Sequence, residues 1–141
     1  SILQFPKQKN YENSLEEEAL RVMKDLNIEQ MSNSYARELS GGQKKLLELG
    51  RSIIRKPDVL LLDEPLAGVN PKLSEELLEI IEKLSNDGIT ILMVEHNIDA
   101  VMKISERVIV LAEGSVIADG LPQEVRENEK VIEAYLGGSD D

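Results

Sequence analysis

Val59-Leu60-Leu61-Leu62-Asp63-Glu64-Pro65 is the stretch of this sequence from which the fold can be argued. Its four apolar residues show no polar alternation, which is typical of a strand buried on both faces of a parallel sheet. Residues 89–94 form a second apolar, β-branched run, and Asn70 and Pro71 between the two runs mark the start of an amphipathic helix. The order strand, helix, strand predicts a βαβ unit with a right-handed crossover, and therefore an α/β fold.

Four polar residues directly follow the two predicted strands. Asp63 and Glu64 end the first run, and Glu95 and His96 follow the second. The carboxyl ends of parallel strands meet at one edge of a sheet, where ligands bind. We therefore predict that this edge carries the chemistry, with Glu95 left outside the set of candidate site residues.

The paired acids suit phosphate chemistry. An aspartate at a strand end can hold magnesium, usually through water, and the metal bridges the terminal phosphates of ATP. Glu64 would orient or deprotonate the attacking water. The alternative for an isolated Asp-Glu pair is that both acids simply end a strand in solvent, but Pro65 and the glycine motif described next favour the phosphate interpretation.

A second motif, Leu39-Ser40-Gly41-Gly42-Gln43, precedes a helix predicted over about residues 42–55, with Ser40 as its N-cap. Such a helix start offers an anion unpaired backbone N–H groups, a hydroxyl and the positive end of the helix dipole. The alternative is an ordinary capped turn, which the flanking leucine and glutamine make less favoured. Ser40, Gly41, Gly42 and Gln43 are therefore candidate phosphate-binding residues.

Two further candidates depend on their neighbours in the sequence. His96 is the only histidine of the chain, and at the predicted edge its imidazole could donate a hydrogen bond to a terminal phosphate. Asn70 ends the loop over residues 67–70 that joins the two acids to the next helix. Each has a structural alternative, a surface histidine in one case and a helix cap in the other.

The remaining elements are predicted to be structural. Ser14 with Glu17 has the form of a capping box that begins a helix. A short helix near residues 97–103, a β-hairpin with strands at 108–111 and 116–118 and further helices from Pro122 should follow, and residues 137–141 should form a mobile tail.

Composition restricts the class of protein. The 141 residues carry a net charge of −11, which disfavours nucleic acid and anionic lipid as partners. The chain has no cysteine, which fits a reducing compartment, and no apolar run approaches the roughly 18 residues of a membrane span. The size is that of one domain or part of a larger one.

These motifs, in their order and spacing, resemble the C-terminal part of the ATP-binding subunit of an ABC transporter, a P-loop NTPase. The resemblance rests on the signature at residues 39–43, the Walker B strand with Glu64, the D-loop region at 67–70 and the switch His96. It implies that residues 1–56 are the C-terminal part of the helical signature subdomain. Residues 57–141 would be the second half of the ATPase core, with its C-terminal hairpin and helices.

The resemblance also implies roles and partners. Two subunits, identical or different, would face head to tail and enclose ATP with magnesium. Ser40, Gly41, Gly42 and Gln43 would contact the nucleotide of the partner subunit, whereas Asp63 as magnesium ligand and Glu64 and His96 as catalytic residues would act within their own subunit. Asn70 stands where many family members carry aspartate. Permease subunits would hold the protein at the cytoplasmic face of the membrane, and a solute-binding protein would take part indirectly in an importer.

No Gly-x-x-x-x-Gly-Lys-Ser/Thr loop occurs in the chain, so we expect an upstream part and no ATP hydrolysis by these residues alone. The residues around 70–72, 95–97 and 131–137 look most like the branched-chain amino-acid uptake branch. A lipopolysaccharide-export ATPase is the first alternative. The head of a DNA-repair or chromosome-maintenance ATPase is less favoured, because no long coiled coil precedes Leu39 and the charge is acidic.

Overall fold

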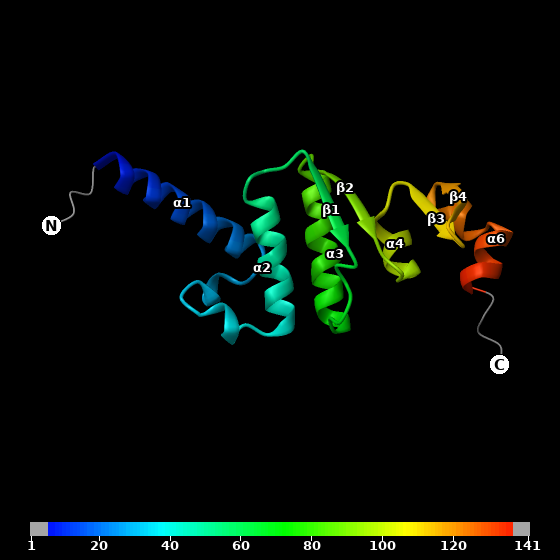
Figure 1. Cartoon of the computed structure of the whole chain (residues 1–141), viewed down its shortest axis with the longest axis horizontal. Helices are drawn as coiled ribbons and strands as arrows, with labels where there is room; N and C mark the ends of the chain where they lie inside the picture. The colour runs from blue at the N-terminus through cyan, green and yellow to red at the C-terminus, as the bar shows by residue number, and fades with distance from the viewer. Residues whose placement is uncertain (1–5, 137–141) are drawn as a thin grey trace. The chain divides into compact units, whose positions relative to one another are not determined.

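A computed structural model describes residues 6–136 of the chain (Figure 1). The chain divides into two compact units, Ser1–Val94 and Glu95–Asp141, which we call unit 1 and unit 2. The tail predicted over residues 137–141 lies outside the described residues. The subdomain boundary predicted between residues 56 and 57 falls within unit 1 and stays a prediction.

Unit 1 contains the predicted βαβ arrangement preceded by helices. Its elements in chain order are α1 (Pro6–Asp25), η1 (Glu29–Met31), η2 (Ala36–Glu38), α2 (Gly41–Ile53), β1 (Val59–Asp63), α3 (Pro71–Asn86) and β2 (Thr90–Val94). Strands β1 and β2 pair in parallel, from Val59 opposite Thr90 to Asp63 opposite Val94. The second strand begins one residue later than predicted, because the amide of Ile89 still donates to the carbonyl of Leu84 and closes the end of α3.

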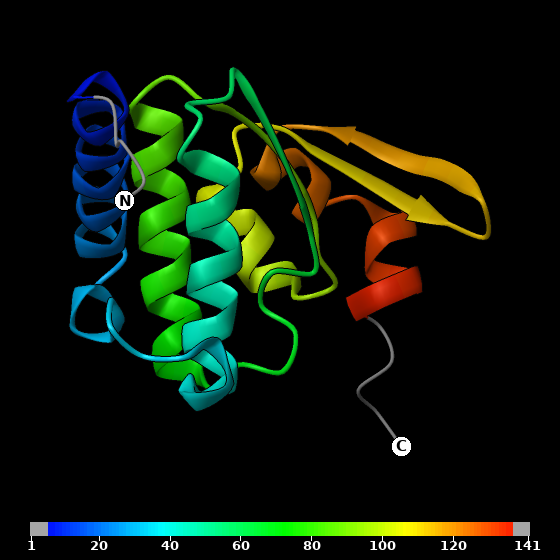
Figure 2. The same ribbon diagram turned by 60° about the vertical axis from the view of Figure 1, so that its left-hand side comes forward.

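The prediction that β1 is buried on both faces is wrong in this structure. Leu60 is 5% exposed, whereas Leu61, its neighbour on the opposite face, is 71% exposed. Leu92 on β2 is likewise exposed. Residues of α2 and α3 pack beside β1 on one face, and no other described element of unit 1 covers the opposite face (Figure 2). The apolar run therefore shows the alternating burial of a sheet that is covered on one side only.

The helices of unit 1 pack closely at a glycine. A Cβ atom on Gly50 of α2 would lie 2.8 Å from Leu26 Cδ1, so any larger residue here would require the Leu26 side chain to shift. The core holds buried residues from the segment after α1 and from α2, β1 and α3: Leu26, Ile28, Leu46, Leu49, Ile53, Leu60, Leu77, Leu78 and Ile81. None of the helices within residues 6–136 has both the length and the apolar character of a membrane span.

The capping box predicted at Ser14 is also wrong. Helix α1 begins at Pro6, a residue suited to a first helical turn because its missing N–H needs no partner there. Ser14 is an interior residue, and its hydroxyl donates to the carbonyl of Tyr11 at 2.7 Å. A serine followed by glutamate three residues later is a local signal, and here the helix that was already formed upstream overrides it.

The cap predicted at Ser40 is confirmed. Ser40 precedes α2, its Oγ accepts from the Gln43 amide at 3.2 Å, and Gln43 Oε1 accepts from the Ser40 amide at 2.8 Å. This reciprocal pair satisfies two backbone donors at the helix start. Asn70 caps α3 in a similar way, since its Oδ1 accepts from the Leu73 amide at 3.0 Å.

Unit 2 contains the predicted short helix, hairpin and C-terminal helices. The elements are α4 (Ile98–Ile104), β3 (Val108–Ala112), β4 (Ser115–Gly120), α5 (Pro122–Arg126), α6 (Glu129–Val131) and the π-helical turn η3 (Ile132–Leu136). The two strands pair antiparallel, with an irregularity between Val110 and Leu111. Val108, Val125 and Val131 form the buried centre of this unit.

A bidentate ion pair joins the two ends of the hairpin. Arg107 donates to Asp119 from Nε at 2.8 Å and from Nη2 at 2.7 Å. These hydrogen bonds hold the pKa of the Asp119 carboxyl below its ordinary value, and the positive charge of the guanidinium adds to the effect.

Leu77→Ala tests the position of the core in unit 1. Leu77 is 2% exposed, so truncation should lower the free energy of unfolding by about 2–5 kcal/mol. Leu61→Ala, the same change on the exposed face of β1, should shift it by about 0.5 kcal/mol or less. Urea unfolding of the two variants checks this, and equal losses would place Leu61 in a packed environment.

Ser40→Ala and Ser14→Ala separate the true cap from the false one. Ser40→Ala should cost about 1 kcal/mol of unfolding free energy, because the Gln43 amide loses its acceptor. Ser14→Ala should be neutral or slightly stabilising, since alanine favours a helix interior. Urea denaturation followed by circular dichroism measures both. A loss at Ser14 as large as the loss at Ser40 would contradict the observed start of α1.

Candidate functional site

The two acids of the first motif lie at the carboxyl end of β1. Asp63 is the last residue of the strand, opposite Val94, and its side chain is exposed. Glu64 follows with a φ of 44°, a left-handed conformation that costs a residue with a side chain roughly 1–2 kcal/mol. Both carboxylates are therefore accessible to solvent at the end of the strand, as a magnesium ligand and a water-activating base require.

The main chain of Glu64 is held on both sides of its Cα atom. Its amide donates to the carbonyl of Val94 at 2.9 Å, which continues the pairing with β2 by one residue. Its carbonyl accepts from the amide of Ala67 at 3.1 Å and from Nζ of Lys45 at 3.2 Å. These bonds fix a backbone conformation that the local sequence does not favour.

The second motif occupies the start of α2. Gly41 and Gly42 are the first two residues of the helix, so their amides have no acceptor within it. Space around Gly41 is open, whereas a Cβ atom on Gly42 would overlap the side chain of Leu73. Glycine at 42 thus permits close packing of α2 on α3, and glycine at 41 leaves the helix start uncovered. This arrangement can bind an anion.

The structure brings the second motif together with the loop before α3. An open hollow of about 510 Å³ is lined by the four residues 40–43 and by Gly68, Val69 and Asn70. Gly68 has a φ of 72°, which favours glycine at this turn. Asn70, predicted as a candidate ligand, therefore borders the same hollow as Ser40, although its side-chain oxygen is engaged in the cap of α3.

Asp63 does not line that hollow. It borders a smaller one of about 190 Å³ together with Lys45 and residues of β1 and α3. The two motifs are close in the chain, and Lys45 links α2 to Glu64. They nevertheless border two different hollows of unit 1. The two motifs therefore do not form one continuous phosphate site within this unit.

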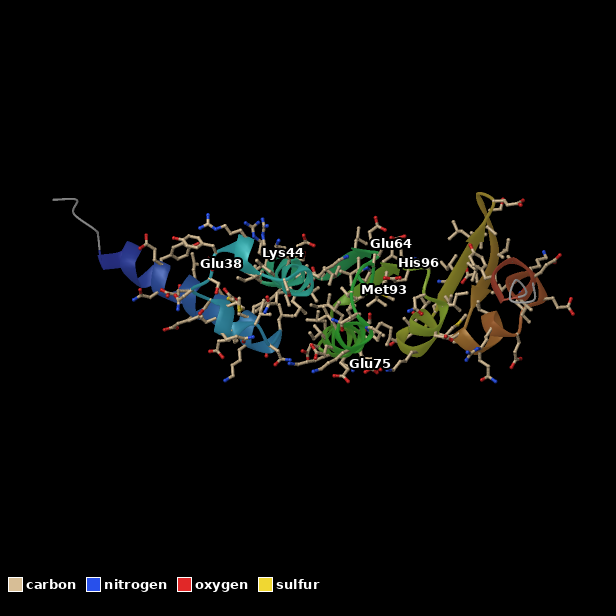
Figure 3. All side chains as sticks on the ribbon, turned by 90° about the horizontal axis from the view of Figure 1, so that it is seen from below. Glu38, Lys44, Glu64, Glu75, Met93 and His96 are labelled. Atoms are coloured by element: carbon tan, nitrogen blue, oxygen red, sulfur yellow. The ribbon has the colours of Figure 1, made fainter. Side chains whose placement is uncertain are left out.

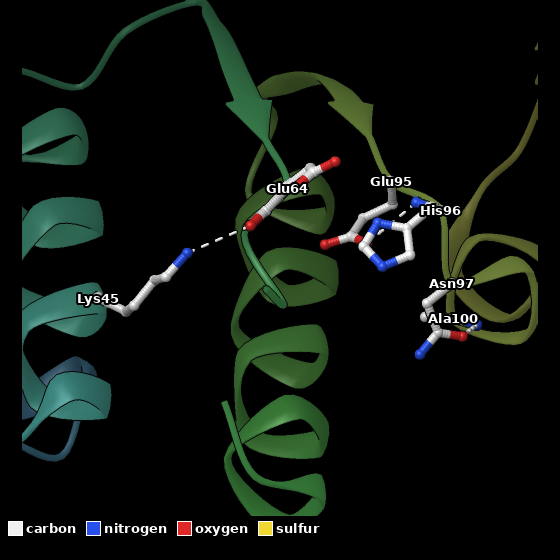
Figure 4. Close-up of polar contacts among 6 residues, drawn as sticks. All are labelled: Lys45, Glu64, Glu95, His96, Asn97 and Ala100. Atoms are coloured by element: carbon white, nitrogen blue, oxygen red, sulfur yellow. Dashed lines mark hydrogen bonds and ion pairs between the residues drawn. The ribbon is translucent and has the colours of Figure 1, made fainter. Parts of the chain in front are cut away.

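His96 belongs to unit 2, two residues after the last residue of β2. Its ring is exposed, and its Nδ1 lies 3.9 Å from Oε2 of Glu95 (Figure 4). The side chain of Glu95 is 1% exposed, and the same Oε2 accepts the His96 amide at 3.2 Å. The role of His96 beside Asp63 and Glu64 stays a prediction.

Sequence reasoning missed two contacts around the candidate residues. Lys45 reaches Glu64 across 19 residues, and no local pattern marks such a contact. Glu95 was left out of the site, yet its buried carboxylate lies against His96. The signal that could have pointed to Glu95 was an acid placed directly after an apolar strand, because such an acid can be buried and a buried carboxylate needs partners.

Within residues 6–136 no group of three or more histidine, aspartate or glutamate side chains could hold a metal ion.

Two family models match the chain. The model of the ABC transporter family matches residues 2–67, and the model described as branched-chain amino acid ATP-binding cassette transporter matches residues 115–141. The first match includes both motifs and begins well upstream of Leu39, the first residue of the signature motif. The chain therefore carries family features over a longer stretch than its motifs alone indicate.

Similar curated proteins come from archaea and bacteria. A probable branched-chain amino acid transport ATP-binding protein LivG of Archaeoglobus fulgidus is 43% identical over 92% of this chain and 50% of its own length. The high-affinity branched-chain amino acid transport ATP-binding protein BraF of Pseudomonas aeruginosa is 37% identical over 96% of this chain and 54% of its own length. The chain thus spans about half the length of the curated relatives it matches.

Solved structures of ABC transporter components share the fold of this chain. An ATP-binding cassette of an ABC transporter in its ADP conformation matches with a TM-score of 0.79 and 34% identity over 88% of this chain and 50% of that chain. A protein of Clostridium perfringens that is part of an ABC transporter complex matches with a TM-score of 0.74 and 32% identity over 94% and 51%. The chain belongs to the family of ABC transporter ATP-binding proteins.

Proposed function

We propose that the complete protein containing this chain is the ATP-hydrolysing subunit of an ABC transporter for branched-chain amino acids. The observation that carries this proposal is the presence, in one unit, of a capped helix start at residues 40–43 and of two exposed acids at the end of β1. Family membership implies nucleotide binding, and the similar curated proteins are named for branched-chain amino acid transport. Nothing favours the lipopolysaccharide-export or DNA-repair alternatives.

The roles proposed for the acids follow from their positions. The exposed Asp63 carboxylate fits a magnesium ion, which prefers oxygen ligands and usually retains water. The bound ion would neutralise charge on the terminal phosphates of ATP. Glu64 would accept the proton of the attacking water or orient it, and His96 would donate a hydrogen bond to the terminal phosphate. Asn70 would contribute from the loop before α3.

The partners proposed are those of a transport ATPase. A second ATP-binding subunit would face this one head to tail, so that Ser40, Gly41, Gly42 and Gln43 bind the nucleotide held by the partner. This proposal is supported by the separation of the two hollows, since the residues of one motif do not line the space beside Asp63. Permease subunits would hold the complex at the cytoplasmic face of the membrane, with a solute-binding protein if transport is inward.

Glu64→Gln should block hydrolysis in the complete protein while ATP still binds. Removal of a general base typically lowers the rate about 10²–10⁴-fold. Phosphate release and equilibrium ATP binding would be measured side by side. Glu75→Gln is the matched control, because Glu75 is an exposed glutamate on α3 away from Glu64 (Figure 3). Preserved turnover in Glu64→Gln would show that Glu64 is not the base.

The 141 residues alone, which lack a phosphate-binding loop, should not hydrolyse ATP.

Ser40→Arg tests the proposed contact with the partner's nucleotide. A long cationic side chain at the start of α2 should prevent ATP-dependent dimer formation, because the helix start could no longer approach the phosphates. Analytical ultracentrifugation in a Glu64→Gln background measures the dimer. Ser40→Ala removes the cap and the hydroxyl but adds neither bulk nor charge, so the helix start can still approach the phosphates and the variant should still dimerise. If Ser40→Arg and Ser40→Ala dimerise equally well, the contact across the dimer does not exist.

A further inference from the structure

One hydrogen bond connects the helix that begins with the glycine motif to the residue proposed as catalytic base. Nζ of Lys45 on α2 lies 3.2 Å from the carbonyl oxygen of Glu64 (Figure 4). Lys45 is partly buried and borders the hollow beside Asp63, and its ammonium group reaches the loop after β1. The contact joins α2, which begins with the glycine motif, to the acid motif within one unit.

The carbonyl that receives this bond belongs to a backbone that needs support. Glu64 has a φ of 44°, and a residue with a side chain keeps such a conformation only where its surroundings hold it. The amide of Glu64 is tied to Val94, and its carbonyl is tied to Ala67 and to Lys45. Of these three bonds, the bond from Lys45 is the only one made by a side chain. It is charge-assisted, and therefore stronger than a neutral bond of the same geometry.

The direction of the Glu64 carboxylate depends on this backbone. The Cα–Cβ bond leaves the main chain at an angle fixed by the covalent geometry of the residue, so rotation of the peptide on either side of Cα turns the side chain with it. A bond that holds the carbonyl therefore also restricts where the carboxylate can point. Lys45 acts on the side chain of Glu64 through its main chain.

Lys45 also lies two residues beyond Gln43, in the first turns of α2. A helix is rigid over so short a distance, so a movement of its start is carried to Lys45. We propose that Lys45 is a positioning residue for Glu64, and that it couples the helix start at residues 40–43 to the orientation of the Glu64 carboxylate. The coupling rests on the proposed function, in which these two groups serve different nucleotides.

The neighbouring lysine provides a matched control. Lys44 is exposed on the same turn of α2, and no side-chain hydrogen bond or ion pair is found for it among the described residues. Lys44→Met and Lys45→Met remove the same charge from adjacent positions, and methionine has nearly the length of the lysine stem. Lys45→Arg restores a long cationic donor. The two methionine variants therefore differ in the hydrogen bond to Glu64 and in the partial burial of position 45, and Lys45→Arg separates these two effects.

Hydrogen exchange on the 141-residue chain tests the contact without any assay of activity. Lys45→Met should speed exchange of the Glu64 and Ala67 amides about fivefold, because the loop after β1 opens more often when the carbonyl loses one donor. Lys44→Met should leave both amides unchanged. The Leu73 amide, bonded to the cap of α3, is the internal reference and should exchange equally in every variant.

The rate of ATP hydrolysis by the complete protein tests the positioning role. Lys45→Met should lower kcat about five- to tenfold with KM unchanged, since Lys45 is not among the residues proposed to contact ATP and one charge-assisted hydrogen bond to the loop is lost. Lys45→Arg should recover most of the rate, and Lys44→Met should match the parent protein. Thermal melting should place Lys45→Met no more than a few degrees below Lys44→Met, the loss expected for one hydrogen bond, which separates positioning from general destabilisation.

Unchanged exchange at Glu64 and Ala67 in Lys45→Met overturns the inference, and so does a kcat equal to that of Lys44→Met. These outcomes differ from failure of the proposed function itself. If Glu64→Gln retains full turnover, then Glu64 is not the base and Lys45 has no catalytic group to position, whatever the exchange data show. If Glu64→Gln is inactive and Lys45→Met is fully active, only the positioning role is lost.

Discussion

The parallel pairing of β1 with β2 is the constraint on which the candidate site of unit 1 depends. The register sets Asp63 opposite Val94 and continues through the amide of Glu64, so the acids can only lie where both strands end. A parallel pair needs a crossover, and α3 supplies it with buried leucines against one face of the strands. Had the strands paired one residue out of register, the acids would exchange faces.

Close approach of helices places the second motif beside this strand pair. Gly50 allows the segment after α1 to cross α2, and Gly42 allows the start of α2 to meet Leu73 of α3. Neither glycine acts in chemistry in these contacts. Their effect is to bring the open helix start against the loop before α3, so that residues 40–43 and 68–70 border one hollow while Asp63 borders another.

The parts that sequence reasoning predicted correctly are those in which the signal and its cause are local. Ser40 and Gln43 satisfy each other's backbone amides across one helical turn, and the Asn70 side chain accepts from the Leu73 amide at the start of α3, where Pro71 needs no acceptor. The helix start predicted at Ser14 is wrong because the helix begins upstream at Pro6, and a serine in a helix interior does not act as a cap. The prediction that Leu61 is buried is wrong because its exposure depends on which layers cover the sheet. No residue pattern within β1 indicates those layers.

The sequence by itself determined the α/β order, the helix caps and the family, because each follows from short patterns of residue type and spacing. Only the tertiary structure decided that one face of β1 is exposed, that Glu95 is buried against His96, and that Lys45 supports the left-handed backbone of Glu64. The physical reason is the same in each case. Burial and hydrogen bonding between residues distant in the chain depend on how whole elements pack, and the residues concerned carry no local mark of that packing.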